Sequence, residues 1–175
     1  MARPEPPEPV CLTELPPGKW QDLAMDFVGP MPTGEYLFVL VDYYTRYYEV
    51  EITTSTTAKR TIDMLDKMFA THGLPVSVTS DNGPQFISSE LVTYLKENGI
   101  SQRRVTPRWA QANGEVERQN RSMLKAMKIA HGQGKNWKTE LIKYLRAYRT
   151  TPHSTTGLAP AELLYGRKIR TKLPE

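Results

Sequence analysis

Apolar and polar positions alternate along the chain in a pattern that first predicts strands and then helices. WQDLAMDFVG (20–29) and YLFVLVDYY (36–44) each have the composition of a strand, and the turn-forming residues PMPTGE separate them. YYEVEI (47–52) follows as a third strand. The second segment is almost wholly apolar, which predicts burial on both faces of a sheet. We therefore expect the domain to begin with three antiparallel strands.

Helical spacing replaces this alternation from residue 56. The stretch 56–73 places Ile62, Leu65 and Phe69 on one face and reaches a C-terminal stop at Gly73. Further helices are expected over 88–99, from Glu115 toward HGQG, and over 136–150 and 159–166. VSVTSDNG and ISQRRV are expected to contain short fourth and fifth strands, and TPRWAQANG (106–114) to be a loop. The pattern predicts an α/β fold, a mixed sheet covered by helices on both faces.

Composition limits the class of protein. A chain of 175 residues with 39% hydrophobic residues fits one domain, and we expect a proline-rich arm at 1–18, a core at 19–166 and a basic tail at 167–175. The net charge of +4 mildly favours a polyanionic partner. Cys11 is the single cysteine, so an intramolecular disulfide and a Cys/His zinc site are excluded. No apolar run has the roughly 20 residues of a membrane span, and we expect a soluble nuclear or cytosolic protein.

Acidic residues are the candidates for a catalytic or metal-binding site. Asp26 lies in the first expected strand, Asp81 follows the fourth, and a long helix begins with two glutamates, Glu115 and Glu117. Residues two apart on a helix point about 200° away from each other, so at most one glutamate can join the aspartates. Gathered carboxylates repel one another unless divalent cations neutralise them, and hard oxygen ligands suit Mg²⁺ or Mn²⁺. These residues therefore predict a two-metal site for displacement at phosphorus.

Four sequence segments carry a resemblance to a known family. MDFVGP, TSDNGPQF, WAQANGEVERQNR and TTPHSTTGLAPAELLYGR resemble the catalytic core of a gypsy-type LTR retrotransposon integrase, a member of the ribonuclease H-like superfamily. The resemblance extends from Lys19 to about Arg170 and implies a five-stranded ribonuclease H-like fold. It implies that the catalytic acids are Asp26, Asp81 and Glu117, with thirty-five residues, 82 to 116, between the last two. By resemblance, Asp26 binds both metal ions, and Asp81 and Glu117 bind one each.

The resemblance also implies a reaction and its partners. The metal ions activate a water to nick the end of the element's DNA, and then the freed 3′-hydroxyl to attack target DNA, without ATP or a covalent enzyme intermediate. The implied partners are retroelement ends, target DNA and further copies of the chain in a homodimer or larger homo-oligomer, with no membrane. The implied location is the nucleus, reached through the cytoplasm.

Candidate DNA contacts lie around the expected glutamate. A cationic strip of the long helix and two amides before it are assigned to DNA: Arg118, Arg121, Lys125, Lys128, Asn113 and Gln111. Family members commonly carry a His-Pro-Gln-Thr-Asn-Gly run where this chain has WAQANG, so we expect a looser loop there. The zinc-binding and C-terminal DNA-binding domains of such integrases are not in this sequence, and we expect an isolated core, excised or domesticated.

Simpler interpretations accompany each assignment. Asp81 before Asn-Gly is typical of a turn, and Glu117 could form an exposed pair with Arg121. The cationic strip could be a solvated helix face. Asp42 is interpreted as a turn residue and His153 as a loop residue. At the level of function, the alternatives are a domesticated core that binds DNA or oligomerises without catalysis, and a ribonuclease H acting on RNA–DNA hybrids.

Overall fold

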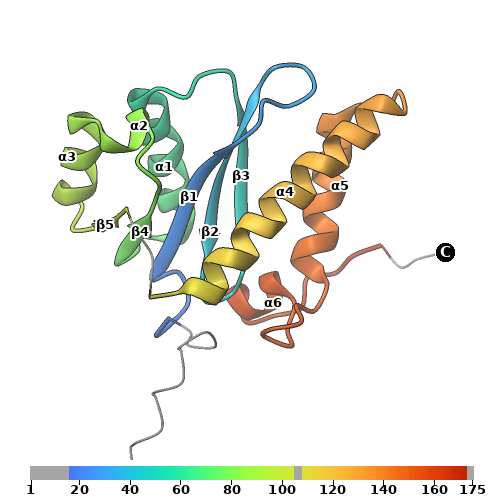
Figure 1. Ribbon diagram of the computed structural model, residues 1–175. Helices are drawn as coiled ribbons and strands as arrows, with labels where there is room; N and C mark the ends of the chain where they lie inside the picture. The colour runs from blue at the N-terminus through green and yellow to red at the C-terminus, as the bar shows by residue number, and fades with distance from the viewer. Residues whose placement is uncertain (1–15, 105–107, 173–175) are drawn as a thin grey trace, which may run out of the picture.

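The computed structural model describes residues 16–104 and 108–172. Five strands form one mixed sheet in the order β3-β2-β1-β4-β5 (Figure 1). β1 (Asp22–Val28), β2 (Tyr36–Asp42) and β3 (Tyr48–Thr53) are antiparallel neighbours, while β4 (Ser77–Thr79) runs parallel to β1, and β5 (Ser101–Arg103) parallel to β4. The predicted five-stranded sheet with an antiparallel start is confirmed.

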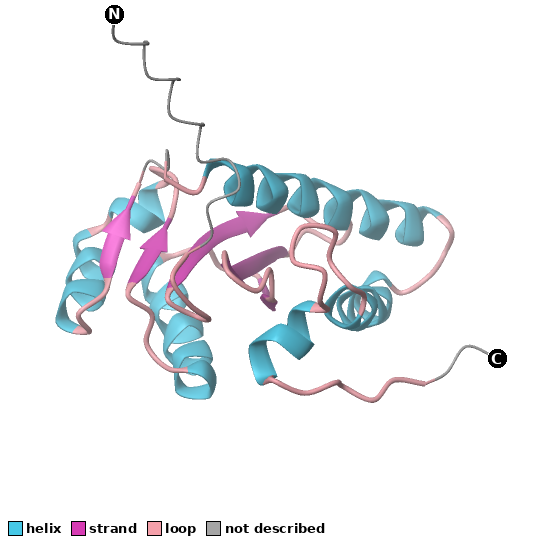
Figure 2. Ribbon diagram, turned by 90° about the horizontal axis from the view of Figure 1, so that it is seen from below, coloured by secondary structure: helices cyan, strands magenta, loops and turns pink. Residues whose placement is uncertain are grey.

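Helices cover both faces of this sheet (Figures 1 and 2). α1 (Ala58–His72), α2 (Pro84–Ile87) and α3 (Ser89–Glu97) lie on one face. α4 (Ala110–Gly132) and α5 (Trp137–Thr150) lie side by side on the other, and α6 (Pro160–Tyr165) packs against α5. None of the helices in the described part of the chain is long and apolar enough to cross a bilayer.

Alternation along the central strands sends side chains into two separate cores. Leu23 and Met25 of β1 pack in the core shared with α1 and α3, while Ala24 and Val28 pack in the core shared with α4 and α5. β2 contributes to both cores and is buried along nearly its whole length, as its apolar sequence predicts. Asp26 falls in the same alternation as Ala24 and Val28, so the strand turns it toward the α4 side of the sheet.

The ends of α1 follow local sequence signals. The Thr57 hydroxyl accepts a hydrogen bond from the Arg60 amide at the N-terminus. Gly73 ends the helix with φ 91°, a conformation that favours glycine, and its amide donates to the Phe69 carbonyl. The predicted stop at Gly73 is confirmed.

Two local predictions are corrected. α4 begins at Ala110, not at Glu115, so the second half of the predicted 106–114 loop is helix, while residues 105–107 lie outside the described chain. Trp109 and Ala112 are buried in the core and hold this first turn against the sheet, which outweighs the turn preference of Asn113-Gly114. The second correction is α2, a single turn that was not predicted.

Candidate active site

The three predicted acids line one pocket beside β1, the end of β4 and the first turns of α4. Its volume is about 270 Å³, and Asp26, Asp81 and Glu117 all contribute to its wall. The remaining lining residues are Ala24, Met25, Thr79, Ser80, Arg104, Asn113, Val116 and Asn120. The structure therefore brings together carboxylates that the sequence spreads over more than half of the chain.

Strand register explains how the two aspartates meet. β1 and β4 are parallel and Ala24 is paired with Thr79. Two residues further along the two segments are Asp26 and Asp81, which therefore emerge at the same edge of the strand pair. α4 packs over this point with Val116 buried in the core, and the next residue, Glu117, reaches the pocket.

The surroundings of Asp26 disfavour its charged form. Burial raises its pKa, a hydrogen bond from the Phe27 amide lowers it, and the negative charges of Asp81 and Glu117 raise it; together these effects bring the pKa to about 6. Because the charges of Asp81 and Glu117 act on Asp26, the three carboxylates belong to one site. Such a site favours a cation.

One oxygen of each carboxylate is already held by the protein. Asp26 Oδ1 accepts from the Phe27 amide at 2.8 Å, Asp81 Oδ1 from the Gly83 amide at 2.8 Å, and Glu117 Oε1 from the Asn113 side-chain amide at 3.2 Å. The second oxygen of each acid makes no hydrogen bond with the described residues. The three acids thus keep three carboxylate oxygens available for a ligand.

Gly83 leaves room beside the backbone for the Asp81 carboxylate. A Cβ atom added at this position would lie 2.9 Å from Asp81 Oδ1, closer than such contacts normally allow. The Asp81-Asn82-Gly83 turn is real, as the simpler interpretation of this segment proposed. The turn and the pocket are compatible, because the turn uses only one of the two Asp81 oxygens.

The donor set fits a divalent cation, although the side chains are not drawn together around one. Within 16–104 and 108–172, no three His, Cys, Asp or Glu side chains lie close enough to hold an ion as they stand. Two further pocket oxygens, Thr79 Oγ1 and Asn120 Oδ1, are buried without a hydrogen-bond partner in the described chain. Buried oxygens without partners are costly, and a hydrated cation would satisfy them. Asp26, Asp81 and Glu117 are the residues that would hold it.

Sequence reasoning missed Thr79 and Asn120. A signal for Asn120 was present, because it lies three residues after Glu117 and therefore on the same side of α4. Thr79 had no such signal, since its place in the pocket depends on the pairing of β4 with β1.

Glu115 serves a different part of the molecule. Its Oε2 accepts from Arg46 Nε at 2.7 Å, and its Oε1 from the Thr155 hydroxyl at 2.6 Å and from Gln111 at 3.3 Å. Arg46 is buried, and it also donates to the Tyr43 carbonyl. Burial raises the pKa of Glu115, but the hydrogen bonds from Thr155 and Arg46 outweigh burial and hold the pKa below its ordinary value. Glu115 is thus half of a structural ion pair, and Glu117 is the glutamate of the pocket.

Two of the simpler interpretations are decided by contacts. Glu117 forms no ion pair with Arg121 within the described residues. Asp42 does act as a turn residue, because its carboxylate accepts from the amides of Trp20, Tyr44 and Thr45 and from the Thr45 hydroxyl. The Asp42 carboxylate is thus used by the turn, and Asp42 does not line the pocket.

His153 lies in the 151–158 loop. Its amide donates to the Leu158 carbonyl, its Nδ1 accepts from the Thr155 amide, and its Nε2 lies 3.9 Å from Glu115 Oε2. The interpretation of His153 as a loop residue is confirmed.

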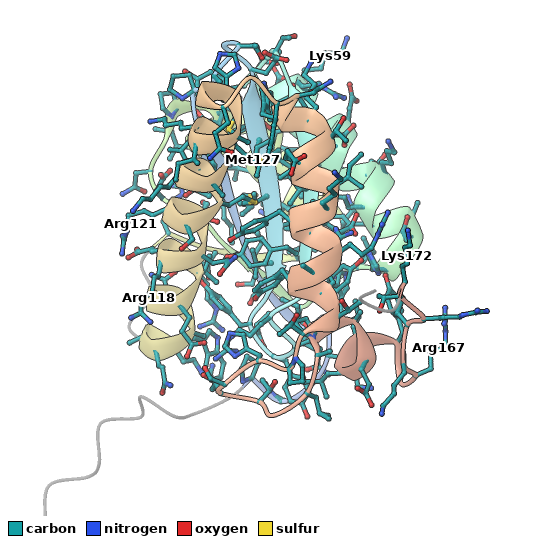
Figure 3. The ribbon with its side chains drawn as sticks, turned by 90° about the vertical axis from the view of Figure 1, so that its right-hand side faces the viewer. Lys59, Arg118, Arg121, Met127, Arg167 and Lys172 are labelled. Atoms are coloured by element: carbon teal, nitrogen blue, oxygen red, sulfur yellow. The ribbon has the colours of Figure 1, made fainter. Side chains whose placement is uncertain are left out.

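The cationic strip lies along the outer side of α4. Arg118, Arg121, Lys125 and Lys128 are exposed, and none forms an ion pair with a described carboxylate. Figure 3 shows Arg118 and Arg121 pointing outward from α4, while Met127 of the same helix points inward. The two amides assigned to DNA differ from the strip, because Gln111 and Asn113 bond to Glu115 and Glu117. A DNA role for all six residues remains a prediction.

Fold and pocket together define an α/β domain of the ribonuclease H-like class with a carboxylate pocket. The model of the integrase core domain family matches residues 14–109, more than half of the chain. The chain belongs to this family. It is 38% identical over 160 residues to an uncharacterized protein of Caenorhabditis elegans and 33% identical over 154 residues to the Pol polyprotein of Feline endogenous virus ECE1. These alignments cover 91% and 86% of this chain but only 12% and 15% of the relatives.

Solved structures agree on the fold. The HTLV-2 integrase catalytic core domain, determined in complex with magnesium, is similar with a TM-score of 0.69 at 18% identity, over 84% of this chain and 97% of that one. A chain in the structure of the simian T-cell lymphotropic virus intasome in complex with PP2A regulatory subunit B56 gamma is similar with a TM-score of 0.72 at 19% identity, over 93% of this chain and 60% of that one. The predicted integrase-type, ribonuclease H-like fold is confirmed.

Proposed function

We propose that this domain catalyses polynucleotidyl transfer on DNA, nicking the ends of a retroelement and joining the freed 3′-hydroxyl to target DNA. The observation that carries the proposal is the convergence of Asp26, Asp81 and Glu117 on one pocket. Membership of the integrase core family supports it. In each step an oxygen nucleophile attacks phosphorus and one phosphorus–oxygen bond breaks, so one phosphodiester can be exchanged for another without ATP.

Asp26, Asp81 and Glu117 would hold Mg²⁺ or Mn²⁺. When bound, a pair of such ions supplies Lewis-acid activation of the attacking oxygen and stabilisation of the leaving oxygen. The protein's part is to hold the acids: the Phe27 and Gly83 amides fix one oxygen of each aspartate. Asp26 must be ionised to bind a cation. Since its pKa in the metal-free protein is raised to about 6, protons compete with the cation for Asp26, and activity at limiting metal concentration should decline as pH falls below about 6.

Substrate binding is assigned to the outer side of α4. Arg118, Arg121, Lys125 and Lys128 follow the helix that carries Glu117, and their charges are not neutralised by described carboxylates. Lysines and arginines of this kind bind phosphates without reading bases. We infer that DNA lies along α4 with a backbone phosphate at the pocket, and that two or more copies of the chain act on two DNA ends.

A disintegration assay tests this function. The protein is given a branched oligonucleotide in Mn²⁺ or Mg²⁺ and asked to reverse strand transfer. We expect product from the unsubstituted chain and none from Asp81→Asn, with Asp63→Asn, an exposed acid of α1, as the matched control. DNA binding without product, in both metals, would contradict the enzyme and favour the alternative, a domesticated core that binds DNA. Cleavage confined to RNA–DNA hybrids would favour a ribonuclease H.

A further inference from the structure

A line of hydrogen bonds connects the interior of the sheet to Glu117. Tyr43 follows the end of β2, and its side chain is completely buried. Its hydroxyl donates to Asn113 Oδ1 at 3.0 Å, and Asn113 Nδ2 donates to Glu117 Oε1 at 3.2 Å. Tyr43 and Glu117 are therefore linked through a single amide.

The direction of these hydrogen bonds is fixed by chemistry. An ionised carboxylate can only accept, so the NH₂ group of Asn113 must face Glu117. The carbonyl oxygen of the same amide then faces Tyr43 and needs a donor. Burial raises the pKa of Tyr43 to about 12, so its hydroxyl keeps its proton at neutral pH and can donate. Tyr43 therefore donates to the Asn113 carbonyl oxygen and the Asn113 NH₂ group donates to Glu117, which is the one arrangement of donors and acceptors that satisfies all three groups.

Tyr43 itself is held firmly. Its amide donates to the Asp22 carbonyl at 3.1 Å, and its own carbonyl accepts from the buried Arg46, which is paired with Glu115 of the same helix as Glu117. The segment after β2 thus contacts the first turns of α4 twice, through Arg46–Glu115 and through Tyr43–Asn113. The second contact ends on a pocket carboxylate.

We propose that Tyr43 and Asn113 are positioning residues for Glu117. Tyr43 orients the Asn113 amide, and the amide holds Glu117 Oε1 so that Oε2 remains available to the pocket. This inference rests on the proposed function, in which Glu117 binds a metal ion. It differs from the prediction that Asn113 contacts DNA, because it gives the amide a partner inside the protein.

Metal affinity measured without DNA tests the inference. Free Mn²⁺ is followed by electron paramagnetic resonance during titration of the chain. Groups that orient a metal ligand typically contribute about 10- to 100-fold to affinity, so Asn113→Leu, which keeps the side-chain shape, should weaken binding about tenfold. Tyr43→Phe, which removes only the hydroxyl, should weaken it by about threefold, less than the loss of the amide itself. Tyr94→Phe is the matched control, since it removes a tyrosine hydroxyl bonded to Asp66 outside the pocket.

A double substitution separates positioning from general destabilisation. If Asn113 acts through Glu117, Asn113→Leu should have no further effect on Mn²⁺ affinity in a Glu117→Gln background. An equal loss in both backgrounds would overturn the inference. Wild-type affinity in Tyr43→Phe and Asn113→Leu, together with weakened binding in Glu117→Gln, would overturn the positioning role and leave the proposed function standing. No difference between wild type and Glu117→Gln would overturn the proposed function and the inference with it.

The first link is measurable in the metal-free protein. The side-chain NH₂ resonances of Asn113 in ¹⁵N-labelled protein should shift in Tyr43→Phe and stay in place in Tyr94→Phe. Unchanged Asn113 resonances in Tyr43→Phe would overturn the link between Tyr43 and the amide, whatever the Mn²⁺ affinities show.

Discussion

Three aspartates of β1 and β2 show how surroundings decide what a carboxylate does. Asp22 accepts a hydrogen bond from the Ser77 hydroxyl at 2.6 Å, and Asp42 accepts from three amides and a hydroxyl. Among the described residues, Asp26 accepts a hydrogen bond from the neighbouring Phe27 amide alone, and it lies in a pocket with two other acids. Of these three carboxylates, that of Asp26 is the one that lines the pocket.

Replacing Asp26 should stabilise the metal-free protein. The folded-state pKa is raised from 3.8 to about 6, so between these values the folded protein binds the proton more tightly than the unfolded chain. Stability therefore falls as pH rises through that window and stays reduced above it. Asp26→Asn should increase the free energy of unfolding by about 2 kcal/mol near neutral pH and by little at about pH 4.

Urea unfolding in a chelator measures both values, with Asp63→Asn as the control. The same Asp26→Asn protein should be inactive. An equal effect of Asp26→Asn at both pH values would contradict the electrostatic cause.

The two glutamates of α4 should respond in opposite ways. Glu115→Gln breaks the ion pair with Arg46, whose side chain is only 3% exposed, and should lower the free energy of unfolding by about 1 to 3 kcal/mol. Because Glu115 does not line the pocket, most activity should remain at temperatures where the variant is folded. Glu117→Gln keeps size but removes the charge that a cation needs, so disintegration should fall by orders of magnitude without loss of stability.

Thermal melting and the disintegration assay distinguish the two glutamate variants. Loss of activity in a folded Glu115→Gln protein, with activity retained in Glu117→Gln, would require the site to be redrawn around the other acid.

At the scale of elements, long periodic segments were predictable from sequence and short ones were not. β1, β2, α1 and α5 have clear spacing and lie where their patterns placed them. α2 is one turn, too short for a period, and the start of α4 was hidden by Asn113-Gly114, which is typical of a turn. The order of the three acids was visible in sequence. The roles of Tyr43, Thr79 and Asn120 were not, because strand register and helix packing place them.

The outer face of α4 should determine how DNA affinity depends on salt. Each phosphate neutralised by a lysine or arginine contributes about 0.9 to the slope of log affinity against log salt. Arg121→Gln with Lys125→Gln should therefore reduce the slope by about 2. Lys59→Gln with Lys96→Gln, exposed cations of α1 and α3, should leave it unchanged.

Fluorescence anisotropy of a labelled duplex over a range of salt gives these slopes. The same slope in both double variants would mean that the α4 cations form a solvated helix face.

At the scale of the molecule, the pocket forms only when the sheet and the helical layer that contains α4 are packed together. β1 supplies Asp26, the segment directly after β4 supplies Asp81, and α4 supplies Glu117 from the layer packed on the sheet. The core beneath α4 therefore supports the site as well as the fold, since Val116 is both a core residue and part of the pocket wall. The described residues of one chain form one pocket lined by the three acids, whereas the proposed joining of two DNA ends to one target needs two such pockets.

We therefore expect the chain to self-associate through its helices. α5 carries Ile142, a large apolar residue that is 59% exposed in the single chain. Covering such a residue in a homodimer is favourable, by roughly 25 cal/mol for each Å² removed from water.

Light scattering at high protein concentration should give the mass of a dimer, and Ile142→Lys should shift it toward the monomer at unchanged melting temperature. Leu74→Lys, which alters an apolar residue of similar exposure in the connection between α1 and β4, is the control. A monomer at every concentration would contradict self-association, and a dimer unaffected by Ile142→Lys would place the contact on another face.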